Sequence, residues 1–493
     1  MKRPAIVVGS GFGGIAAALR LRALGYEVLV LEARDQPGGR AAVFRRDGYT
    51  FDAGPTVITA PHLFDELFEL HGRKREDYVE LLPVDPFYRI AFADGSSFDY
   101  VQDGERLLEE IRRFHPPDVA GYERMVEQSK QIFEVGYEQL ADVPFESITD
   151  MLKILPQMLR LGSFRSVYAM VSKYLEDERL RQVFSFQPLL VGGHPFRVTS
   201  IYALIHWLER KWGVYFAKGG TGALVAALVR LLEEVGVTIR YSAPINRIDV
   251  DDGGRARSVV LESGERIDGE IVVCNADPSV VYAHMIDPRF RKKHTDRRIK
   301  RLDQSMGLFV GYFGTDRTYP ELAHHTIVLG PRYRGLLDDI FQSKVLAEDF
   351  SLYLHAPTRT DPSMAPEGHE AFYVLSPVPN NVSGIDWRQE GERYFERILA
   401  ELERRVLPEL SKHLTTRFFV TPNYFATELR SMNGAAFGIE PTLRQSAYFR
   451  YHNRSEDVDG LFFVGAGTHP GAGLPGVLNS ARVLERCVRR AEA

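Results

Sequence analysis

Residues 5–14 read AIVVGSGFGG, an apolar run that passes into a turn with four glycines. The run has the length of a buried parallel strand, and residues 15–19, IAAAL, predict a helix after it. In a strand–turn–helix unit of this kind, Gly9 permits the sharp turn, Gly11 lets the backbone approach a pyrophosphate, and Gly14 lets the helix pack against the strand. The phosphates then face amides at the helix N-terminus, so this stretch predicts a dinucleotide-binding turn.

A second strand supports this prediction. Residues 27–31, EVLVL, end directly before Glu32, which follows Gly14 by eighteen residues. An acidic side chain at that point can accept hydrogen bonds from a ribose. We therefore assign Glu32 and its neighbour Ala33 to nucleotide binding. A structural βαβ unit without a nucleotide is the alternative.

Another glycine pair follows closely, in Pro37-Gly38-Gly39-Arg40. The glycines leave backbone clearance for a long dinucleotide, and a guanidinium can neutralise phosphate charge. The spacing from Glu32 resembles the extended motif of the flavoprotein amine oxidase and desaturase superfamily. That resemblance implies that Gly38, Gly39 and Arg40 lie along FAD. A glycine turn with a surface arginine is the alternative.

A Gly-Pro turn comes next, within the stretch FDAGPT at residues 51–56. In the flavoproteins that this sequence resembles, the stretch passes beneath the flavin ring. The resemblance therefore assigns Gly54, Pro55 and Thr56 to the cofactor site. A plain hairpin turn is the alternative on local signals.

The end of the chain carries another glycine-rich loop. Six glycines fall within residues 460–476, after an apolar strand, so the backbone is expected to approach another group closely. We assign Gly465 and Gly467 of this loop to the cofactor, together with Gly476 and Val477 at a predicted helix start. Amides at such a start can face a pyrophosphate or the carbonyl edge of a flavin. A purely structural loop is the alternative.

Two further site residues lie in the middle of the chain. In FAD folds of this type, the strand near Ile245 lends backbone groups to the adenine. The strand that ends at Asn275 is expected to return to the main sheet beside the nucleotide. We therefore predict an α/β protein with a Rossmann-like FAD-binding domain, similar to glutathione reductase and the amine oxidases, and with inserted regions.

The predicted FAD-binding domain is discontinuous and comprises residues 1–60, 213–295 and 456–493. Residues 61–212 are predicted as a helical, membrane-facing and substrate-binding region, and residues 296–455 as a second, α+β substrate-binding region. A chain of 493 residues is long enough for such an arrangement.

Composition excludes several classes of protein. The net charge of −5, from 61 basic and 66 acidic residues, gives no signal for nucleic-acid binding. Cys274 and Cys487 have neither metal-site nor disulfide spacing, which fits a reducing, cytoplasmic compartment. No secretory signal precedes the first strand, and no apolar run reaches eighteen residues. We therefore expect any contact with a membrane to be peripheral.

Residues 151–173 could make such a contact, because they hold four basic residues and no acidic one. Helical apolar spacing with basic flanks suits a helix that lies among lipid headgroups. A pair of ordinary helices packed on the core, with the basic side chains in solvent, explains the pattern equally well.

The motifs together resemble the bacterial and fungal type phytoene desaturases over the whole chain. Beyond those quoted above, the resemblance rests on residues 190–193 (LVGG), 219–222 (GGTG), 324–326 (HHT), 349–353 (DFSLY) and 465–471 (GAGTHPG). It implies an FAD enzyme, acting on CH–CH groups, that introduces double bonds stepwise into the C40 polyene phytoene and forms neurosporene or lycopene. A membrane surface and a homo-oligomer are compatible with that family. The electron acceptor, a quinone or oxygen, leaves no motif.

Catalytic side chains are harder to identify. We find no spacing for a Ser/His/Asp triad or for a metal site, and a flavin would carry the difficult redox step itself. Asp150, one turn before Lys153, is our candidate proton acceptor, although an Asp at a helix start usually serves as a cap. Five histidines have no discriminating spacing and are expected to be structural: His194, His206, His324, His325 and His355.

Three alternatives to a desaturase stay open at this point. A flavin amine oxidase would need an aromatic pair beside the flavin and a polar entrance. A carotenoid isomerase would use FAD without net oxidation. A prenyl-binding escort protein would have no reason to keep an FAD site.

Overall fold

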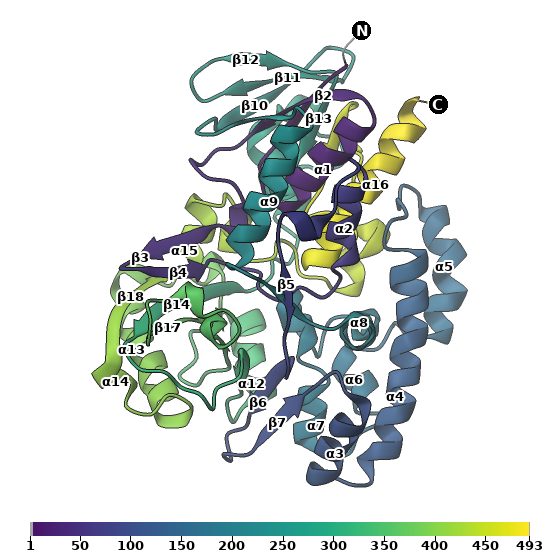
Figure 1. Cartoon of the computed structure of the whole chain (residues 1–493). Helices are drawn as coiled ribbons and strands as arrows, with labels where there is room; N and C mark the ends of the chain where they lie inside the picture. Colours follow the sequence, from purple (N-terminus) through teal and green to yellow (C-terminus); the bar gives the residue numbers. More distant parts are fainter. Residues whose placement is uncertain (1–2, 493) are drawn as a thin grey trace.

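The computed structural model describes residues 3–492, and its first layer is a five-stranded parallel sheet (Figure 1). The strand order is β19-β13-β1-β2-β9, and every neighbouring pair is parallel. The strands are β1 (Arg3–Val8), β2 (Tyr26–Leu31), β9 (Thr238–Arg240), β13 (Ile271–Cys274) and β19 (Leu461–Phe463). Three separate parts of the chain therefore build one sheet.

Both faces of this sheet are covered, which explains why its strands read as continuous apolar runs. Helices α1 (Phe12–Ala23), α9 (Thr221–Glu234) and α16 (Leu474–Glu492) lie on one face, with α2 (His62–Glu69) beside them (Figure 1). The other face packs against a three-stranded sheet of β10 (Ile245–Val250), β11 (Ala256–Leu261) and β12 (Arg266–Asp268). The predicted α/β fold is confirmed.

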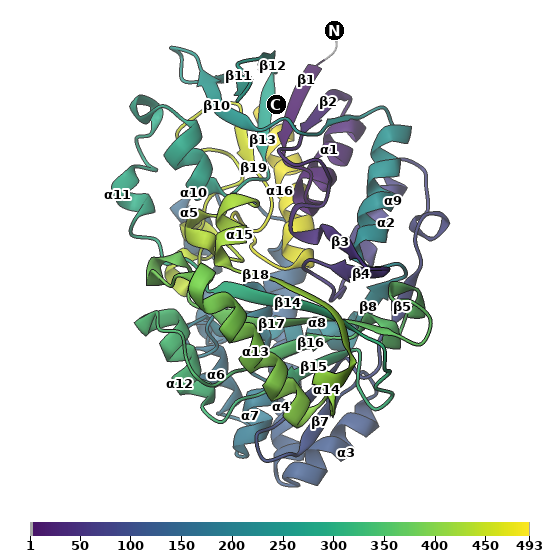
Figure 2. The same ribbon diagram turned by 90° about the vertical axis from the view of Figure 1, so that its left-hand side faces the viewer.

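A second, seven-stranded sheet lies below the first in Figure 2. Its order is β18-β14-β17-β16-β15-β6-β7, and β15 pairs in parallel with β6 while the other pairs are antiparallel. The strands are β6 (Tyr88–Ala91), β7 (Ser97–Tyr100), β14 (Gly307–Thr315), β15 (His325–Val328), β16 (Leu352–His355), β17 (Glu370–Val378) and β18 (Leu414–Val420). The sheet thus unites strands from residues 61–212 with strands from residues 296–455.

The two faces of the second sheet have different partners. Helix α13 (Trp387–Arg405) covers one face, where Phe309 and Phe313 of β14 are buried against it. The alternate residues Leu308 and Val310 point to the opposite face, which lines a cavity. This period of two is the expected behaviour of a strand between two apolar layers.

A group of helices from residues 104–212 packs beside the second sheet (Figure 1). They are α3 (Gly104–Phe114), α4 (Asp118–Phe133), α5 (Ile148–Arg160), α6 (Val167–Val171), α7 (Glu178–Val183) and α8 (Leu204–Trp212), and α8 contributes side chains to the cavity wall. The remaining elements are β3 (Val43–Arg46), β4 (Tyr49–Asp52), β5 (Leu81–Pro83), β8 (Tyr215–Ala217), α10 (Pro278–Val280), α11 (Asp296–Ile299), α12 (Tyr333–Asp338), α14 (Leu410–His413) and α15 (Pro422–Thr427). Within residues 3–492, none of the helices is long and apolar enough to span a bilayer.

Candidate active site

The glycine turn after β1 is held by the acidic residue at the end of β2. Glu32 is buried, and its Oε2 atom accepts hydrogen bonds from Ser10 N at 2.8 Å and Ser10 Oγ at 2.7 Å. Its Oε1 atom accepts another from Arg34 N at 3.0 Å. The carboxylate thus fixes the turn and remains at the wall of a cavity, where further donors can reach it.

Close backbone packing explains the glycines of the turn. A Cβ on Gly14 would lie 2.0 Å from the carbonyl oxygen of Gly9, so α1 can approach β1 only with glycine there. Asn275 lies between the turn and the C-terminal loop, because a Cβ on Gly13 or on Gly465 would come within 2.5 Å of its Oδ1 atom. The side chain of Asn275 therefore joins two loops that are distant in the sequence.

One cavity of about 490 Å³ runs from this turn to the second sheet. Its wall contains most of the cofactor residues that the sequence predicts, namely Gly9, Gly11, Glu32, Ala33, Gly38, Gly39, Arg40, Gly54, Pro55, Thr56, Ile245, Asn275, Gly465, Gly476 and Val477. Gly14 and Gly467 are not in the wall. Gly14 packs on Gly9, and a Cβ on Gly467 would meet the Pro278 ring at 2.3 Å.

The far part of the cavity is apolar. Side chains from α8 and from the second sheet face each other across it, including Leu204, Ile205 and Leu208 on one side and Leu308, Val310, Ile327 and Leu375 on the other. Phe186, Leu189 and Leu190 close the space between them. Such a lining suits a hydrocarbon ligand, and only a few polar groups interrupt it.

Arg40 is half-buried in the cavity wall and fits an anionic ligand. Its Nη2 atom donates to Ser431 Oγ at 2.8 Å, while its buried Nε atom has no partner. Burial lowers the pKa of Arg40, and the charge of Asp277 opposes that shift. A phosphate group would supply the missing acceptor.

A polar cluster lies where the turn at residues 54–56 meets the second sheet. Thr56 Oγ1 is 2.8 Å from the Tyr373 hydroxyl and 3.2 Å from the Tyr353 hydroxyl. Tyr353 in turn lies 2.7 Å from Nδ1 of His325. These groups are buried and give the apolar cavity one polar end.

Three buried histidines stand behind this polar end, and the sequence alone did not bring them together. His325 of β15 pairs with His355 of β16, and His324 is the neighbour of His325. Nitrogens of the three rings lie within 4.8 Å of one another, and burial lowers the pKa of all three. Nearby, burial raises the pKa of Asp52 to about 7, although backbone hydrogen bonds from Thr221 and Gly222 oppose the shift.

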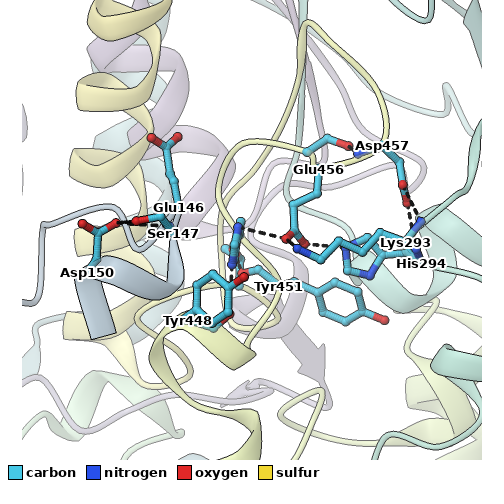
Figure 3. Close-up of polar contacts among 12 residues, drawn as sticks. Glu146, Ser147, Asp150, Lys293, His294, Tyr448, Tyr451, Glu456 and Asp457 are labelled. Atoms are coloured by element: carbon cyan, nitrogen blue, oxygen red, sulfur yellow. Dashed lines mark hydrogen bonds and ion pairs between the residues drawn. The ribbon is translucent and has the colours of Figure 1, made fainter. Parts of the chain in front are cut away.

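Asp150, the candidate proton acceptor, lies outside this cavity wall. It is the third residue of α5 and forms a capping box with Ser147, whose N and Oγ atoms donate to its Oδ2 atom at 3.1 and 2.9 Å (Figure 3). Desolvation opposes these contacts, but the hydrogen bonds from Ser147 and the charge of Lys153 hold its pKa below the ordinary value. The geometry is that of a helix cap.

Comparison with known proteins identifies the class. Residues 12–483 match the family of flavin-containing amine oxidoreductases, and the protein belongs to that family. Solved relatives share the fold at low identity. Putrescine oxidase bound to putrescine aligns with a TM-score of 0.64 and 15% identity, over 100% of this chain and 99% of the other. Cyclohexylamine oxidase from Brevibacterium oxydans aligns with a TM-score of 0.63 and 16% identity, over 100% of both chains.

Other relatives have a much higher sequence identity to this chain. The lycopene-forming phytoene desaturase of Pantoea ananas is 48% identical over 97% of this chain and 98% of its own. The neurosporene-forming phytoene desaturase of Rhodobacter capsulatus is 42% identical over 98% of this chain and 93% of its own. The protein is thus an oxidoreductase with FAD as its cofactor. Glu32, the glycine turn and the unpartnered Arg40 nitrogen fit the ribose and phosphates of that dinucleotide.

Proposed function

We propose that the protein is an FAD-dependent phytoene desaturase, which introduces successive double bonds into a C40 polyene and forms neurosporene or lycopene. The observation that carries this proposal is the single cavity that is polar at the dinucleotide turn and apolar beyond residues 54–56. The names of the Pantoea and Rhodobacter relatives support the choice of polyene. An amine substrate would leave this long apolar wall without a purpose.

The roles of the residues follow from the cavity. When bound, FAD supplies the hydride acceptor for the oxidation of a C–C bond. Glu32 would hold the ribose, the glycines would admit the pyrophosphate, and Arg40 would neutralise it. Leu204, Leu208 and the side chains opposite them would exclude water and hold the polyene in a defined register.

We also propose that α5 attaches the protein to the cytoplasmic side of a membrane, from which the substrate enters. No residue of α5 is buried, and its exposed side chains Ile148, Leu152, Leu155 and Leu159 follow the helical spacing of one face. Phe164, which follows the helix by four residues, is 62% exposed. Lys153, Arg160 and Arg165 add positive charge for anionic headgroups.

The electron acceptor in this proposal is a membrane quinone or oxygen, and assembly into a homo-oligomer on the membrane is compatible with it. Attachment through α5 would bring the enzyme to a quinone pool and to the lipid-dissolved polyene at the same surface. Exposed apolar residues in helical spacing with basic neighbours support this arrangement.

Product analysis tests the proposed reaction. The FAD-loaded protein is incubated with phytoene in liposomes containing a quinone, and the extracted polyenes are separated by chromatography. We expect products with two to eight fewer hydrogens and longer absorption wavelengths. Recovery of isomers of unchanged mass would instead make the protein a carotenoid isomerase.

A further inference from the structure

One buried carboxyl group lies in the cavity wall away from the dinucleotide turn. Glu209 of α8 is completely buried and lies in the wall between the apolar part and the second sheet. Its Oε1 atom accepts a hydrogen bond from the Tyr88 hydroxyl at 2.8 Å, and its Oε2 atom has no partner. A buried carboxyl oxygen without a partner is costly, so its retention calls for an explanation.

Glu209 belongs to the polar end of the cavity. The ring of Tyr88, its donor, lies 5.8 Å from the ring of His325, measured between centroids. His325 contacts Tyr353, which contacts Thr56. Three side chains thus connect Glu209 to the turn at residues 54–56, where the family resemblance implies the flavin ring. A polyene in the apolar part would pass between that turn and α8.

Glu209 is also suited to exchange a proton near neutral pH. Burial raises its pKa to about 8, although the hydrogen bond from Tyr88 and the nearby Tyr100 hydroxyl oppose the shift. The titratable and charged groups around it are Tyr88 of β6, Tyr100 of β7, Tyr122 of α4, and His206 and Arg210 of α8. Burial raises the pKa of each of these tyrosines and lowers that of His206 to about 3. The three tyrosines and His206 are therefore neutral at the pH where Glu209 titrates.

We propose that Glu209 is the catalytic residue that accepts the proton lost from the polyene during each desaturation. This inference rests on the proposed desaturase function. One C–H bond breaks with its electron pair, which leaves as hydride to the flavin. The neighbouring C–H bond gives its proton to the Glu209 carboxylate, and its electron pair becomes the new π bond. The substrate thus loses two hydrogens, the flavin gains two electrons, and Glu209 later releases the proton.

The substitution Glu209→Gln separates this role from a structural one. The amide has the same shape and still accepts the Tyr88 hydrogen bond, so a structural role predicts an almost unchanged rate. A general base contributes about 10²- to 10⁴-fold. We expect flavin reduction by phytoene, followed anaerobically, to slow by at least about 100-fold. FAD affinity, measured by fluorescence titration, should stay unchanged. A normal rate in a folded, FAD-loaded Glu209→Gln protein would overturn the proposal.

The pH dependence provides a second readout. The wild-type rate should rise through pH of about 8, because the carboxylate is the active form. Tyr88→Phe removes a hydrogen bond that favours the carboxylate, so its profile should move to higher pH. An unchanged pH–rate profile in Tyr88→Phe would contradict the role of Glu209 as proton acceptor, even if Glu209→Gln failed to fold. Inactive wild-type protein at every pH would instead refute the desaturase function itself.

The protein without cofactor gives a third, activity-independent readout. A carboxyl group whose pKa rises from 4.5 in the unfolded chain to about 8 in the folded one stabilises the fold below pH 4.5. That contribution is lost as the pH rises from 4.5 to about 8. Thermal unfolding across this range should therefore be less pH-dependent in Glu209→Gln than in the wild type. Identical slopes would contradict the raised pKa of Glu209 and the rise in rate near pH 8 that is expected from it.

Discussion

Among single residues, Glu32 holds the glycine turn and, in the proposed site, also faces the ribose of the nucleotide. It accepts three hydrogen bonds, two of them from Ser10, and it lines the cavity. Its Oε2 atom holds the turn through Ser10, while its Oε1 atom accepts one hydrogen bond from Arg34 N and keeps acceptor capacity for the proposed ribose. A change at Glu32 should therefore affect FAD binding more than the stability of the fold.

We predict that Glu32→Gln weakens FAD binding by about 10- to 100-fold, since hydrogen bonds to a charged group contribute about 1.5–3 kcal/mol. Titration of the cofactor-free protein with FAD, monitored by flavin fluorescence, measures the change. Glu69→Gln, at the exposed end of α2, is the matched control and should bind FAD normally. Equal affinities in the two variants would contradict the placement of the ribose.

Asp150 allows its two candidate roles to be separated. An asparagine keeps an oxygen that can accept the Ser147 hydrogen bonds but cannot take up a proton, whereas alanine removes both properties. From the capping-box geometry we predict that Asp150→Asn retains activity and that Asp150→Ala lowers the free energy of unfolding by about 1 kcal/mol. Inactive but folded Asp150→Asn protein, measured by phytoene turnover, would restore Asp150 as the proton acceptor.

Local spacing in the sequence brings some of the predicted site residues together in the fold. The turn at Gly9 to Gly14 and the acidic end of β2 lie within one βαβ unit, so their spacing alone brings them to one place. Glu209 and the three histidines escaped this reasoning. His325 and His355 meet only because β15 pairs with β16, and Tyr88 and Glu209 are 121 positions apart in the sequence. No local pattern records such contacts.

At the scale of elements, residues 151–173 fall between the two predicted alternatives. Helix α6 is packed on the core through Val167, Met170 and Val171, as in the helix-pair alternative. Helix α5 buries no residue, as the interfacial alternative requires. The sequence could not divide the stretch, because both halves have apolar spacing and only tertiary packing decides which one is covered.

We predict that replacing Leu152 and Leu159 by glutamate weakens binding to anionic liposomes by more than about tenfold. Each leucine is nearly 60% exposed, and full burial of a leucine is worth about 1.5–3 kcal/mol. Flotation of the protein with vesicles measures the loss. Val382→Glu, an equally exposed apolar residue on another surface, serves as the control. Undiminished flotation of the double variant would exclude α5 as the membrane contact.

A second element-scale contact joins the loop before α11 to the chain before β19. Glu456 bonds to His294 Nε2 at 2.7 Å and to Lys293, while His452 lies 3.3 Å away (Figure 3). Burial alone would raise the pKa of Glu456, but His294, His452 and Lys293 lower it to about 2. This contact therefore stabilises the fold fully above the unfolded pKa of 4.5 and is lost as the pH falls toward 2.

We predict that Glu456→Gln lowers the midpoint temperature of unfolding at pH 7 and that its deficit shrinks as the pH falls from 4.5 toward 2. Thermal unfolding followed by circular dichroism over this pH range measures both effects. Glu123→Gln, on the exposed side of α4, controls for the loss of one carboxylate. A deficit that is constant with pH would mean that Glu456 is not ionised through this contact.

For the whole molecule, the sequence predicts the five-stranded sheet better than the seven-stranded one. The five-stranded parallel sheet follows from its apolar strands and glycine loops, even though three distant segments form it. The seven-stranded sheet does not follow, because β6 and β7 join β15 across more than two hundred residues. That long-range pairing brings together the strands of the cavity wall, so no local pattern identifies the residues that line its apolar part.

In the proposed enzyme, FAD and a polyene occupy two parts of one cavity. Anaerobic mixing of the FAD-loaded protein with phytoene in liposomes tests this arrangement, with the flavin band and the polyene spectrum recorded together. We predict that the flavin bleaches while polyene absorbance moves to longer wavelength in the same reaction. Bound flavin that stays oxidised, with an unchanged polyene spectrum, would contradict the account.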